Sequence, residues 1–582
     1  MESTVPLLSL SQRRAGLMLA SLMLSALTAC ALDDRAPPPP EPPVAVAVAP
    51  PPSTPPAIAP VAQAAETAAA DAAYAVRSAK AMQRSAMLMP QPAFVAEVRE
   101  RYAELQSNAV QRVAESPVST FSIDVDTGAY ANVRRFLHQG QMPPRDAVRV
   151  EELVNYFDYV YPKPRERSVP FSVMTEIAPT PWNPKTHLLH VGIQGWQMQG
   201  ERPASNLVFL VDVSGSMQSP DKLPLVKSSL KLLAQQLRPQ DRLSLVVYAG
   251  ASGVILEPTA GDQQAKIVAA LDRLEAGGST NGGAGIDMAY AMAKQGYIRS
   301  GVNRVLLATD GDFNVGVTDF QQLLDRAKDQ RKSGIALTTL GFGSGNYNEA
   351  LMEQLADAGD GNYAYIDTLS EAQKVLVRQM DATLTTIARD VKVQVEFNPA
   401  QVAEYRLIGY ENRVLRREDF ANDRVDAGDI GAGHRVTALY EVALVGDGGE
   451  RIAPLRYGKP AGAAANAGEL AHLRLRYKPA NAGGDAKSLL IERAIGASDA
   501  SGRTLAAASD AFRLAAAVAG FGQLLRGGEY TEAFDYTAVM NLARSARGRD
   551  DNGEAGEFLQ LVQLARSLDT SALKPTAGNN GG

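Results

Sequence analysis

The sequence predicts an α/β protein in which a doubly wound domain, residues 201–387, is inserted in a β-rich flanking domain and followed by C-terminal helices. Short apolar runs are typical of parallel strands that helices cover on both faces. In the central domain these runs are Asn206–Val211, Leu243–Tyr248, Arg304–Ala308 and Ile335–Leu340. Amphipathic segments separate the runs, and this alternation over about 180 residues favours a doubly wound sheet. Strand patterns on both sides of the domain predict the flanking sheets.

Composition excludes several classes of site. The chain has 582 residues, a formal net charge of −6, one cysteine and five histidines. A single cysteine rules out an intramolecular disulfide framework, cysteine-based zinc fingers and iron–sulfur clusters. The mildly acidic balance argues against a nucleic-acid binder, which would show a basic patch or stripe.

The first thirty residues have the pattern of an export signal. Arg13 and Arg14 precede Ala15–Leu27, an uncharged apolar run of 13 residues. A membrane-spanning helix needs about 20 residues, so this run better fits the apolar core of a signal peptide. Two alternatives remain, namely an uncleaved anchor over Ala15–Leu32 and an ordinary signal peptide that happens to end in a cysteine. Each of them places the folded part outside the cytoplasm.

The end of this segment, Leu27-Thr28-Ala29-Cys30, resembles the bacterial lipoprotein signal, in which a small residue precedes the cysteine that is lipidated. The resemblance implies that residues 1–30 are a lipoprotein signal peptide and that a diacylglyceryl-modified Cys30 anchors the chain in the cell envelope. Ala31 follows the cysteine in place of aspartate, which by resemblance to enterobacterial sorting favours the outer membrane.

Residues 31–91 are expected to form a tether rich in proline and alanine. Ala36–Pro60 contains twelve prolines. Such a segment adopts extended polyproline II at about 3.1 Å per residue and would reach roughly 75 Å. The tether would hold the folded body away from a membrane, and the alternative is a disordered segment with no length requirement.

The flanking regions, residues 92–200 and 388–572, combine strands and helices. Strands are expected at Thr120–Val125, Pro170–Ile177, His187–Ile193, Val391–Phe397, Tyr405–Tyr410, His434–Val445 and His472–Tyr477. Helices are expected at Ala93–Gln111 and Ala147–Phe157 and throughout 485–570, with the strongest patterns at Ser509–Leu525 and Glu554–Leu568. Residues 573–582 are expected to be a disordered tail. Since a doubly wound domain is self-contained, the outer strands are expected to pair with one another as a β-sandwich.

The first helix of the central domain shows clear capping signals. Five apolar residues are spaced three and four apart, which puts them on one helix face: Leu223, Val226, Leu230, Leu233 and Leu237. Asp221 is expected to cap this helix, Pro224 suits its first turn, and Pro239 bars its extension.

Polar residues follow the predicted strands, at the sheet edge where doubly wound folds bind ligands. They lie in Asp212–Met217, in the glycine-rich run Gly277–Ile286 and in Thr309–Asp312. The order and spacing of these three loops resemble the von Willebrand factor type A domain. In that family D-x-S-x-S, a loop threonine and a later aspartate form the metal-ion-dependent adhesion site. The resemblance assigns this role to Asp212, Ser214, Ser216, Thr280 and Asp310.

The resemblance implies bound Mg²⁺, or another divalent cation, and a protein partner. Mg²⁺ takes six oxygen ligands in octahedral geometry and usually keeps waters. In the family the hydroxyls contact the metal directly, whereas the aspartates act partly through water. Neutral hydroxyl donors leave the cation under-neutralised, so an open coordination position is expected to attract a carboxylate from a partner.

A second glycine-rich run, Gly341–Gly345, also follows a predicted strand. It lacks the Lys-Ser/Thr pair of a phosphate-binding P-loop. The expected structure is a turn at the edge of the sheet.

Further segments on both sides of the central domain extend the resemblance to a group of bacterial envelope lipoproteins. They are Phe121–Leu137, Arg149–Phe157 and Ala178–Pro184 before the domain, and Tyr405–Phe420 and Gly431–Val442 after it. These lipoproteins have an N-terminal region, a central von Willebrand A domain and a C-terminal region of unknown function. The match predicts architecture better than activity.

The expected function is a non-enzymatic, Mg²⁺-dependent adhesin or assembly scaffold of the cell envelope that binds a protein partner. One alternative is an accessory to an ATPase or metal-insertion chaperone system, a role that some bacterial proteins with this domain have in the cytoplasm. The other alternative is a metal-dependent hydrolase. No histidine lies in residues 191–433, so the sequence offers no histidine base beside the metal site.

Overall fold

The computed structural model describes residues 100–569, except 124–125, 167, 279–281, 312–319, 426, 454, 457–467, 481–485, 497–503, 547 and 549. The signal peptide with Cys30, the tether and the C-terminal tail of the sequence prediction lie outside the described residues. Among the helices of the described part, none is both long and apolar enough to cross a membrane.

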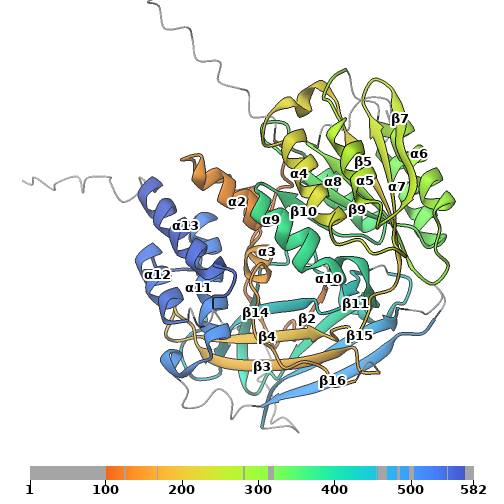
Figure 1. The fold of residues 1–582 in the computed structure, drawn as a ribbon. Coiled ribbons are helices and arrows are strands. Elements are labelled where there is room, and N and C mark those ends of the chain that lie inside the picture. The colour runs from red at the N-terminus through yellow and green to blue at the C-terminus, as the bar shows by residue number, and fades with distance from the viewer. Residues whose placement is uncertain are drawn as a thin grey trace, which may run out of the picture. The chain divides into compact units, whose positions relative to one another are not determined.

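A six-stranded sheet forms the centre of the predicted doubly wound domain (Figure 1). Its order is β10-β9-β8-β5-β6-β7, and all neighbouring pairs are parallel except β6–β7. The strands are β5 Ser205–Asp212, β6 Arg242–Tyr248, β7 Ser252–Ala260, β8 Val302–Thr309, β9 Ala336–Phe342 and β10 Tyr363–Ile366. The chain leaves β5 toward β6 and later returns to the other side of β5 as β8. The strand order therefore reverses between β5 and β8.

Helices cover both faces of this sheet, as the continuous apolar strands require. The first face carries α4 Leu223–Ala234, α5 Gln264–Asp272 and α9 Leu369–Gln373, which continues as a π-helical turn Lys374–Arg378 and α10 Met380–Leu384. The second face carries α6 Gly282–Gln295, α7 Phe320–Lys332 and α8 Glu349–Ala358. The predicted α/β fold class is thus confirmed.

The start of α4 differs from the prediction. Lys222, rather than Asp221, is the residue at the N-cap, and no side chain caps the helix. The Asp221 carboxylate instead accepts a hydrogen bond from Ser219 Oγ at 2.5 Å. Pro224 lies in the first turn, as predicted.

Strands from both flanks pair into two antiparallel sheets. The first has the order β1-β12-β14-β4-β3, and its strands are β1 Gln111–Arg112, β12 Val402–Ile408, β14 Arg435–Leu444, β4 His187–Gly195 and β3 Phe171–Pro179. The second has the order β13-β11-β15-β16, with β2 also on β11, and its strands are β13 Ile430–Gly431, β11 Thr386–Phe397, β15 Glu469–Pro479, β16 Leu489–Gly496 and β2 Val118–Ser122. The pairing of β4 with β14 confirms that the two flanks form common sheets around the inserted domain.

Period-two patterns explain why these segments are strands. In β11 the buried residues Val391, Val393 and Val395 alternate with polar neighbours. They share one core with Val191 and Ile193 of β4, so the two sheets pack face to face as the predicted sandwich.

Helices cover the other face of the first sheet. They are α2 Gly128–His138, α3 Val150–Asn155, α11 Asp510–Leu525, α12 Tyr536–Ser545 and α13 Glu554–Leu568, and they share a core with Leu188 and Leu439 of the sheet. Short 3₁₀ turns lie at Arg145–Ala147, Gly215–Gln218, Arg417–Ala421 and Leu505–Ala507.

Three flanking segments differ from the sequence predictions. The helix expected over Ala93–Gln111 is absent from its described part, because residues 100–110 form no helix and Asn108 Nδ2 donates to Leu407 O and Gly409 O. The segment that forms β16 was expected to be helical, but it pairs along β15. Helix α2 was not predicted. In each case partners distant in sequence decide the local structure.

The two connections to the inserted domain leave the sandwich beside the same segment, 431–434. Gly433 N donates to Trp196 O at 2.9 Å, and Ala432 N donates to Thr385 O at 2.8 Å. Trp196 directly follows β4, and Thr385 directly precedes β11. One short segment therefore ties the entry and the exit of the domain together.

Buried ion pairs join α8 of the inserted domain to the flanks. Arg149 is only 1% exposed, and its Nη2 lies 2.9 Å from Glu353 Oε2. Arg413 Nη2 lies 2.6 Å from the other oxygen of Glu353. Glu349 is also fully buried, but its Oε2 is 3.6 Å from Arg149 Nε, which is too long for a hydrogen bond. Glu152 lies 3.5 Å from Arg149 and Asp357 lies 3.0 Å from Arg413, so this contact holds more carboxylates than its two arginines neutralise.

Replacing Glu349 with glutamine is expected to stabilise the protein at pH 8 and to have little effect at pH 5. Burial raises the pKa of Glu349 from 4.5 to about 7, although Arg149 acts in the opposite direction. The folded state thus favours the protonated carboxyl, and wild-type stability falls as the pH rises from 4.5 toward 7. The glutamine variant lacks this penalty, so at pH 8 it gains roughly 1–3 kcal/mol in unfolding free energy.

Urea unfolding of both proteins at pH 5 and pH 8 measures this difference. The control is Glu275→Gln, because Glu275 is an exposed carboxylate of the same domain. A glutamine variant that is less stable than wild type at both pH values would contradict the prediction.

Candidate metal centre

The loop after β5 positions the first three predicted ligands. Asp212 is the last residue of β5, and Ser214 and Ser216 follow it. Asp212 Oδ1 accepts a hydrogen bond from Ser214 N at 2.9 Å, which bends the chain back over the strand end. Ser214 Oγ and Ser216 Oγ lie 3.0 Å apart. The D-x-S-x-S segment therefore gathers its carboxylate and both hydroxyls at one place.

Asp310 reaches the same place from β8. It directly follows this strand, and Ser216 contributes a side-chain hydrogen bond to its carboxylate. Thr309 Oγ1 also links the two strand ends, because it donates to Asp212 Oδ2 at 3.0 Å. Asp212, Ser214, Ser216 and Asp310 thus form one chain of contacts between β5 and β8, where the strand order reverses and doubly wound folds bind ligands.

The predicted Thr280 lies outside the described residues, but its loop is anchored at the site. Gly277 N donates to Val213 O at 2.7 Å, and Gly215 N donates to Gly278 O at 3.0 Å. These two bonds hold the start of the glycine-rich loop against the D-x-S-x-S segment. Helix α6 begins immediately after the loop, at Gly282.

The two aspartates differ in their electrostatics. Burial raises the pKa of Asp212 to about 6, and this rise exceeds the opposing effect of its hydrogen bonds from Ser214 and Thr309. Burial acts on Asp310 in the same direction, but the Lys222 ammonium, together with hydrogen bonds from Lys222, Ser216 and Asn346, lowers the pKa of Asp310 below its usual value. The charge of Asp310 is thus compensated by Lys222, whereas Asp212 forms no ion pair with a cation in the part of the chain that the structure describes.

The donor set fits a small hard cation. Two carboxylates and two hydroxyls supply only oxygen atoms, the ligands that Mg²⁺ prefers. Elsewhere in the described residues, as here, no group of three or more histidine, cysteine, aspartate or glutamate side chains is arranged to hold a metal ion. The candidate centre therefore depends on hydroxyls as much as on carboxylates.

Sequence reasoning missed two side chains that shape the centre. Lys222 Nζ lies 2.8 Å from Asp310 Oδ2, and Asn346 Nδ2 donates to the same oxygen at 3.2 Å. Neither residue belongs to the three polar loops, so no local pattern marked them. Their contacts arise because α4 begins beside the loop that follows β9.

That loop also corrects the prediction for Gly341–Gly345. The turn was expected at the edge of the sheet, but β9 lies between β8 and β10 and is an interior strand. The segment that follows it, Gly343–Asn346, therefore lies at the carboxyl end of the sheet, next to Asp310.

Family comparisons match most of the described chain. The von Willebrand factor type A domain family matches residues 206–379, and a family described as von Willebrand factor matches 96–190. A third family, described as the C-terminal part of the uncharacterized protein YfbK, matches 382–568.

One similar protein matches this chain over most of its own length. The uncharacterized protein YfbK of Escherichia coli K12 is 50% identical over 474 residues, which cover 80% of this chain and 81% of the relative. A von Willebrand factor type A structure from Catenulispora acidiphila has 17% identity and a TM-score of 0.36, covering 66% of this chain and 88% of its own. Proximal thread matrix protein 1 from the mussel byssus, solved with a zinc-occupied MIDAS motif, has 19% identity and a TM-score of 0.25. The match covers 30% of this chain and 44% of the mussel protein.

Proposed function

Because this chain belongs to the YfbK family and contains a von Willebrand factor type A domain, we propose that it is a non-enzymatic lipoprotein of the cell envelope that binds a protein partner through a divalent cation. The type A domain family commonly uses metal-dependent protein binding. The proposed ligands are Asp212, Ser214, Ser216, Thr280 and Asp310, with Mg²⁺ as the cation. The partner would act in adhesion or in the assembly of an envelope complex.

One observation carries the proposal: two separate loops bring Asp212, Ser214, Ser216 and Asp310 into contact at the reversal of the strand order. Asp212 is fully buried, yet among the described residues no cationic side chain donates a hydrogen bond to it. When bound, Mg²⁺ would neutralise this carboxylate and offer an exchangeable position to a carboxylate of the partner. The residues of the chain hold the ligand oxygens in place through the backbone bonds of Ser214 and Gly215.

The envelope location is supported by the sequence of the first thirty residues. An apolar run followed by Leu27-Thr28-Ala29-Cys30 favours export and lipidation, with the outer membrane as the favoured destination. A Cys30→Ser variant is expected to lose membrane association.

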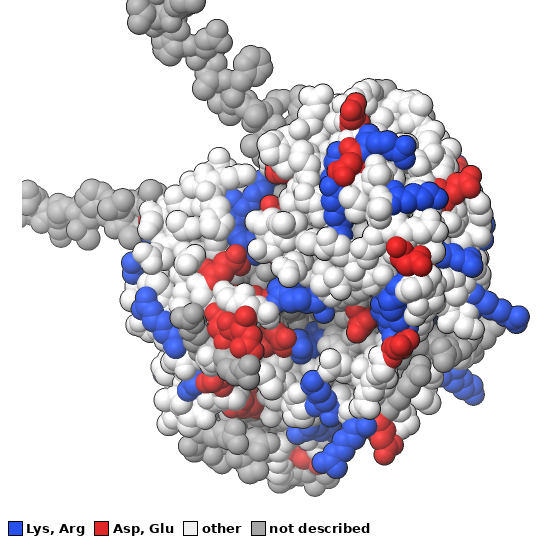
Figure 2. Space-filling model, in the orientation of Figure 1, with Lys and Arg blue, Asp and Glu red and all other residues white. Residues whose placement is uncertain are grey.

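Charge and chemistry support a protein partner and a binding role. On the face in Figure 2, basic and acidic side chains are interspersed, so this face offers no continuous basic stripe for a nucleic-acid backbone. Lys222, a basic side chain that contacts the centre, is itself bonded to Asp310 and Asn346. This supports metal-dependent binding rather than hydrolysis.

Crosslinking in the native envelope followed by affinity recovery of the full chain tests the proposal. A partner should be recovered with Mg²⁺ and lost with EDTA. The Asp212→Ala variant should lose the partner even with Mg²⁺, by at least about ten-fold, because the variant lacks a ligand carboxylate.

The matched control is Asp272→Ala, since Asp272 is an exposed aspartate of the same domain. Equal recovery of the partner from wild type, with and without EDTA, and from Asp212→Ala would disprove the proposed function.

A further inference from the structure

Lys222 is a buried cation beside the candidate metal centre. Only 7% of the residue is exposed. Its Nζ lies 2.8 Å from Asp310 Oδ2 and donates to Asn346 Oδ1 at 3.0 Å. Because Asn346 Nδ2 also donates to Asp310 Oδ2, a triangle of bonds fixes one oxygen of the carboxylate.

The surrounding loop leaves a channel for the lysine side chain. A Cβ at Gly343 would lie 2.5 Å from Lys222 Cε and closer still to Cγ, so only glycine leaves room for the stem. Gly343 also has a φ of 75°, which favours glycine. Tyr365 OH donates to Gly343 O at 2.6 Å, and Glu100 Oε1 accepts from Gly345 N at 2.8 Å. The chain therefore positions this ammonium with both packing and hydrogen bonds.

The charges at the centre give the lysine a role. Asp212 and Asp310 contribute two negative charges, and Lys222 contributes one positive charge at hydrogen-bond distance from Asp310. A divalent cation at the same ligands is attracted by both carboxylates and repelled by the ammonium. Without a metal, the ammonium adds a positive charge to the neutral donors Ser216 and Asn346 and so stabilises the buried carboxylate of Asp310.

We propose that Lys222 is a built-in counter-cation that stabilises the metal-free centre and weakens its affinity for divalent ions. The inference rests on the proposed function, because it assumes that these residues bind a metal. Lys222 is then a positioning residue. It sets the affinity of the centre for divalent ions, and thereby the cation concentration at which a partner is bound.

Titration of the full chain in detergent micelles with MgCl₂, followed by calorimetry, tests this role. The Lys222→Met variant is expected to bind Mg²⁺ at least about ten-fold more tightly than wild type, because it lacks the repelling charge. Its melting temperature in EDTA should fall below that of wild type, and Mg²⁺ should raise it by more. The Lys222→Arg variant keeps the charge and should bind nearly as wild type does.

A matched control and a second neutral variant make the result decisive. The control is Lys231→Met. Lys231 lies in α4, the helix that Lys222 precedes, and it pairs with the exposed Asp272, so the Mg²⁺ affinity of this variant should equal that of wild type. Lys222→Gln replaces Lys222→Met if the methionine variant does not fold. If wild type binds Mg²⁺ and both neutral variants bind it equally or more weakly, the role of Lys222 is refuted while the metal site stands. If neither wild type nor the neutral variants bind Mg²⁺, the proposed function fails and this inference fails with it.

Discussion

Replacing Arg134 with methionine is expected to lower the free energy of unfolding by about 3–5 kcal/mol. Arg134 lies in α2 and is 2% exposed. Its Nη2 lies 2.7 Å from Glu371 Oε2 of α9, its Nη1 lies 3.0 Å from Glu557 Oε2 of α13, and its Nε donates to Asp367 at 2.8 Å. The methionine would leave two buried carboxylates, Asp367 and Glu371, without their cation.

Urea unfolding followed by circular dichroism measures this loss. Arg326→Met is the control, because Arg326 pairs with Asp287 at 2.8 Å on the surface. The Arg326 side chain is 41% exposed and the Asp287 side chain is 60% exposed. Such exposed pairs contribute at most about 1 kcal/mol. A loss at Arg134 no larger than the loss at Arg326 would show that the buried carboxylates find other partners.

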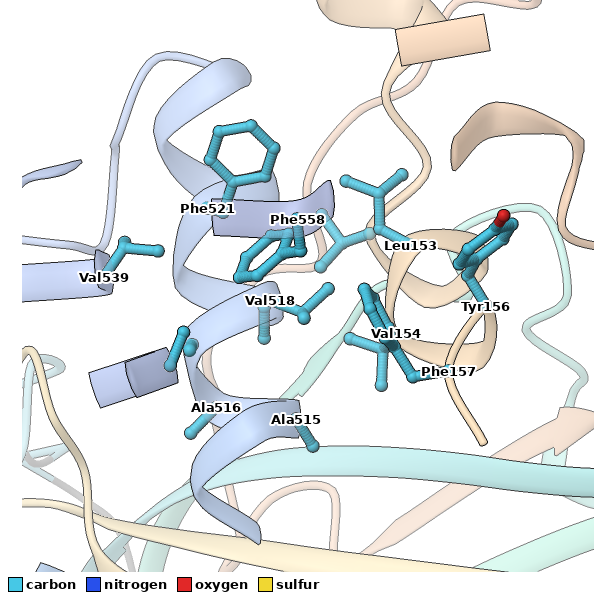
Figure 3. Packing of buried hydrophobic residues seen from close by; sticks show 14 of the residues in the cluster. Leu153, Val154, Tyr156, Phe157, Ala515, Ala516, Val518, Phe521, Val539 and Phe558 are labelled. Carbon is cyan, nitrogen blue, oxygen red and sulfur yellow. The ribbon is translucent and has the colours of Figure 1, made fainter. Parts of the chain in front are cut away.

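Replacing Phe558 with alanine is expected to cost a comparable 3–5 kcal/mol, roughly the range for deleting a buried aromatic side chain. Phe558 of α13 is fully buried among side chains of α11 and α3 (Figure 3). Its ring meets Phe521 at 5.4 Å and Phe157 at 5.6 Å between centroids, both in edge-to-face geometry. Alanine would remove these contacts and leave a cavity between three helices that come from both flanks.

The change in melting temperature and the urea midpoint check this prediction. Gln560→Ala on the same helix is the control, because Gln560 is exposed and its replacement removes no buried contact. A loss below about 1.5 kcal/mol at Phe558 would mean that α13 repacks to fill the space.

Much of the fold follows from local sequence patterns. The run Leu207–Val211 is apolar throughout because β5 lies at the centre of a sheet covered on both faces, and β11 alternates because one of its faces packs in the sandwich. Such patterns report burial directly, so they predicted four strands of the central sheet, β5, β6, β8 and β9, and the longer strands of the sandwich except β16. The strands β7 and β10 at the two edges of the central sheet were not predicted. Helix α13 was equally clear, since its buried residues recur at helical spacing.

The rest depends on partners that local patterns do not reveal. The segment Leu489–Gly496 has an apolar start and mixed charges, and it is a strand because β15 offers an edge for pairing. Residues 100–110 have a composition typical of a helix, but they form none and instead bridge several elements through hydrogen bonds. In both segments the local sequence pattern alone favoured a helix.

The candidate centre also combines residues that a local motif marked with residues that only the fold brings together. Asp212, Ser214 and Ser216 lie within five residues, so one motif marked them together. Lys222 and Asn346 are separated by more than a hundred residues along the chain, and only the approach of α4 to the loop after β9 brings them to Asp310. Sequence reasoning therefore found the proposed ligands and missed the side chains that tune them.

The hydrogen bonds that join both connections of the inserted domain to segment 431–434 have a mechanical consequence. A force applied to this domain loads the sandwich through Trp196 and Thr385, which continue into β4 and β11. Both strands have neighbours on either side, so a force along them shears several ladders of hydrogen bonds at once and does not peel an edge. The architecture is thus suited to carry tension from the inserted domain into the sandwich.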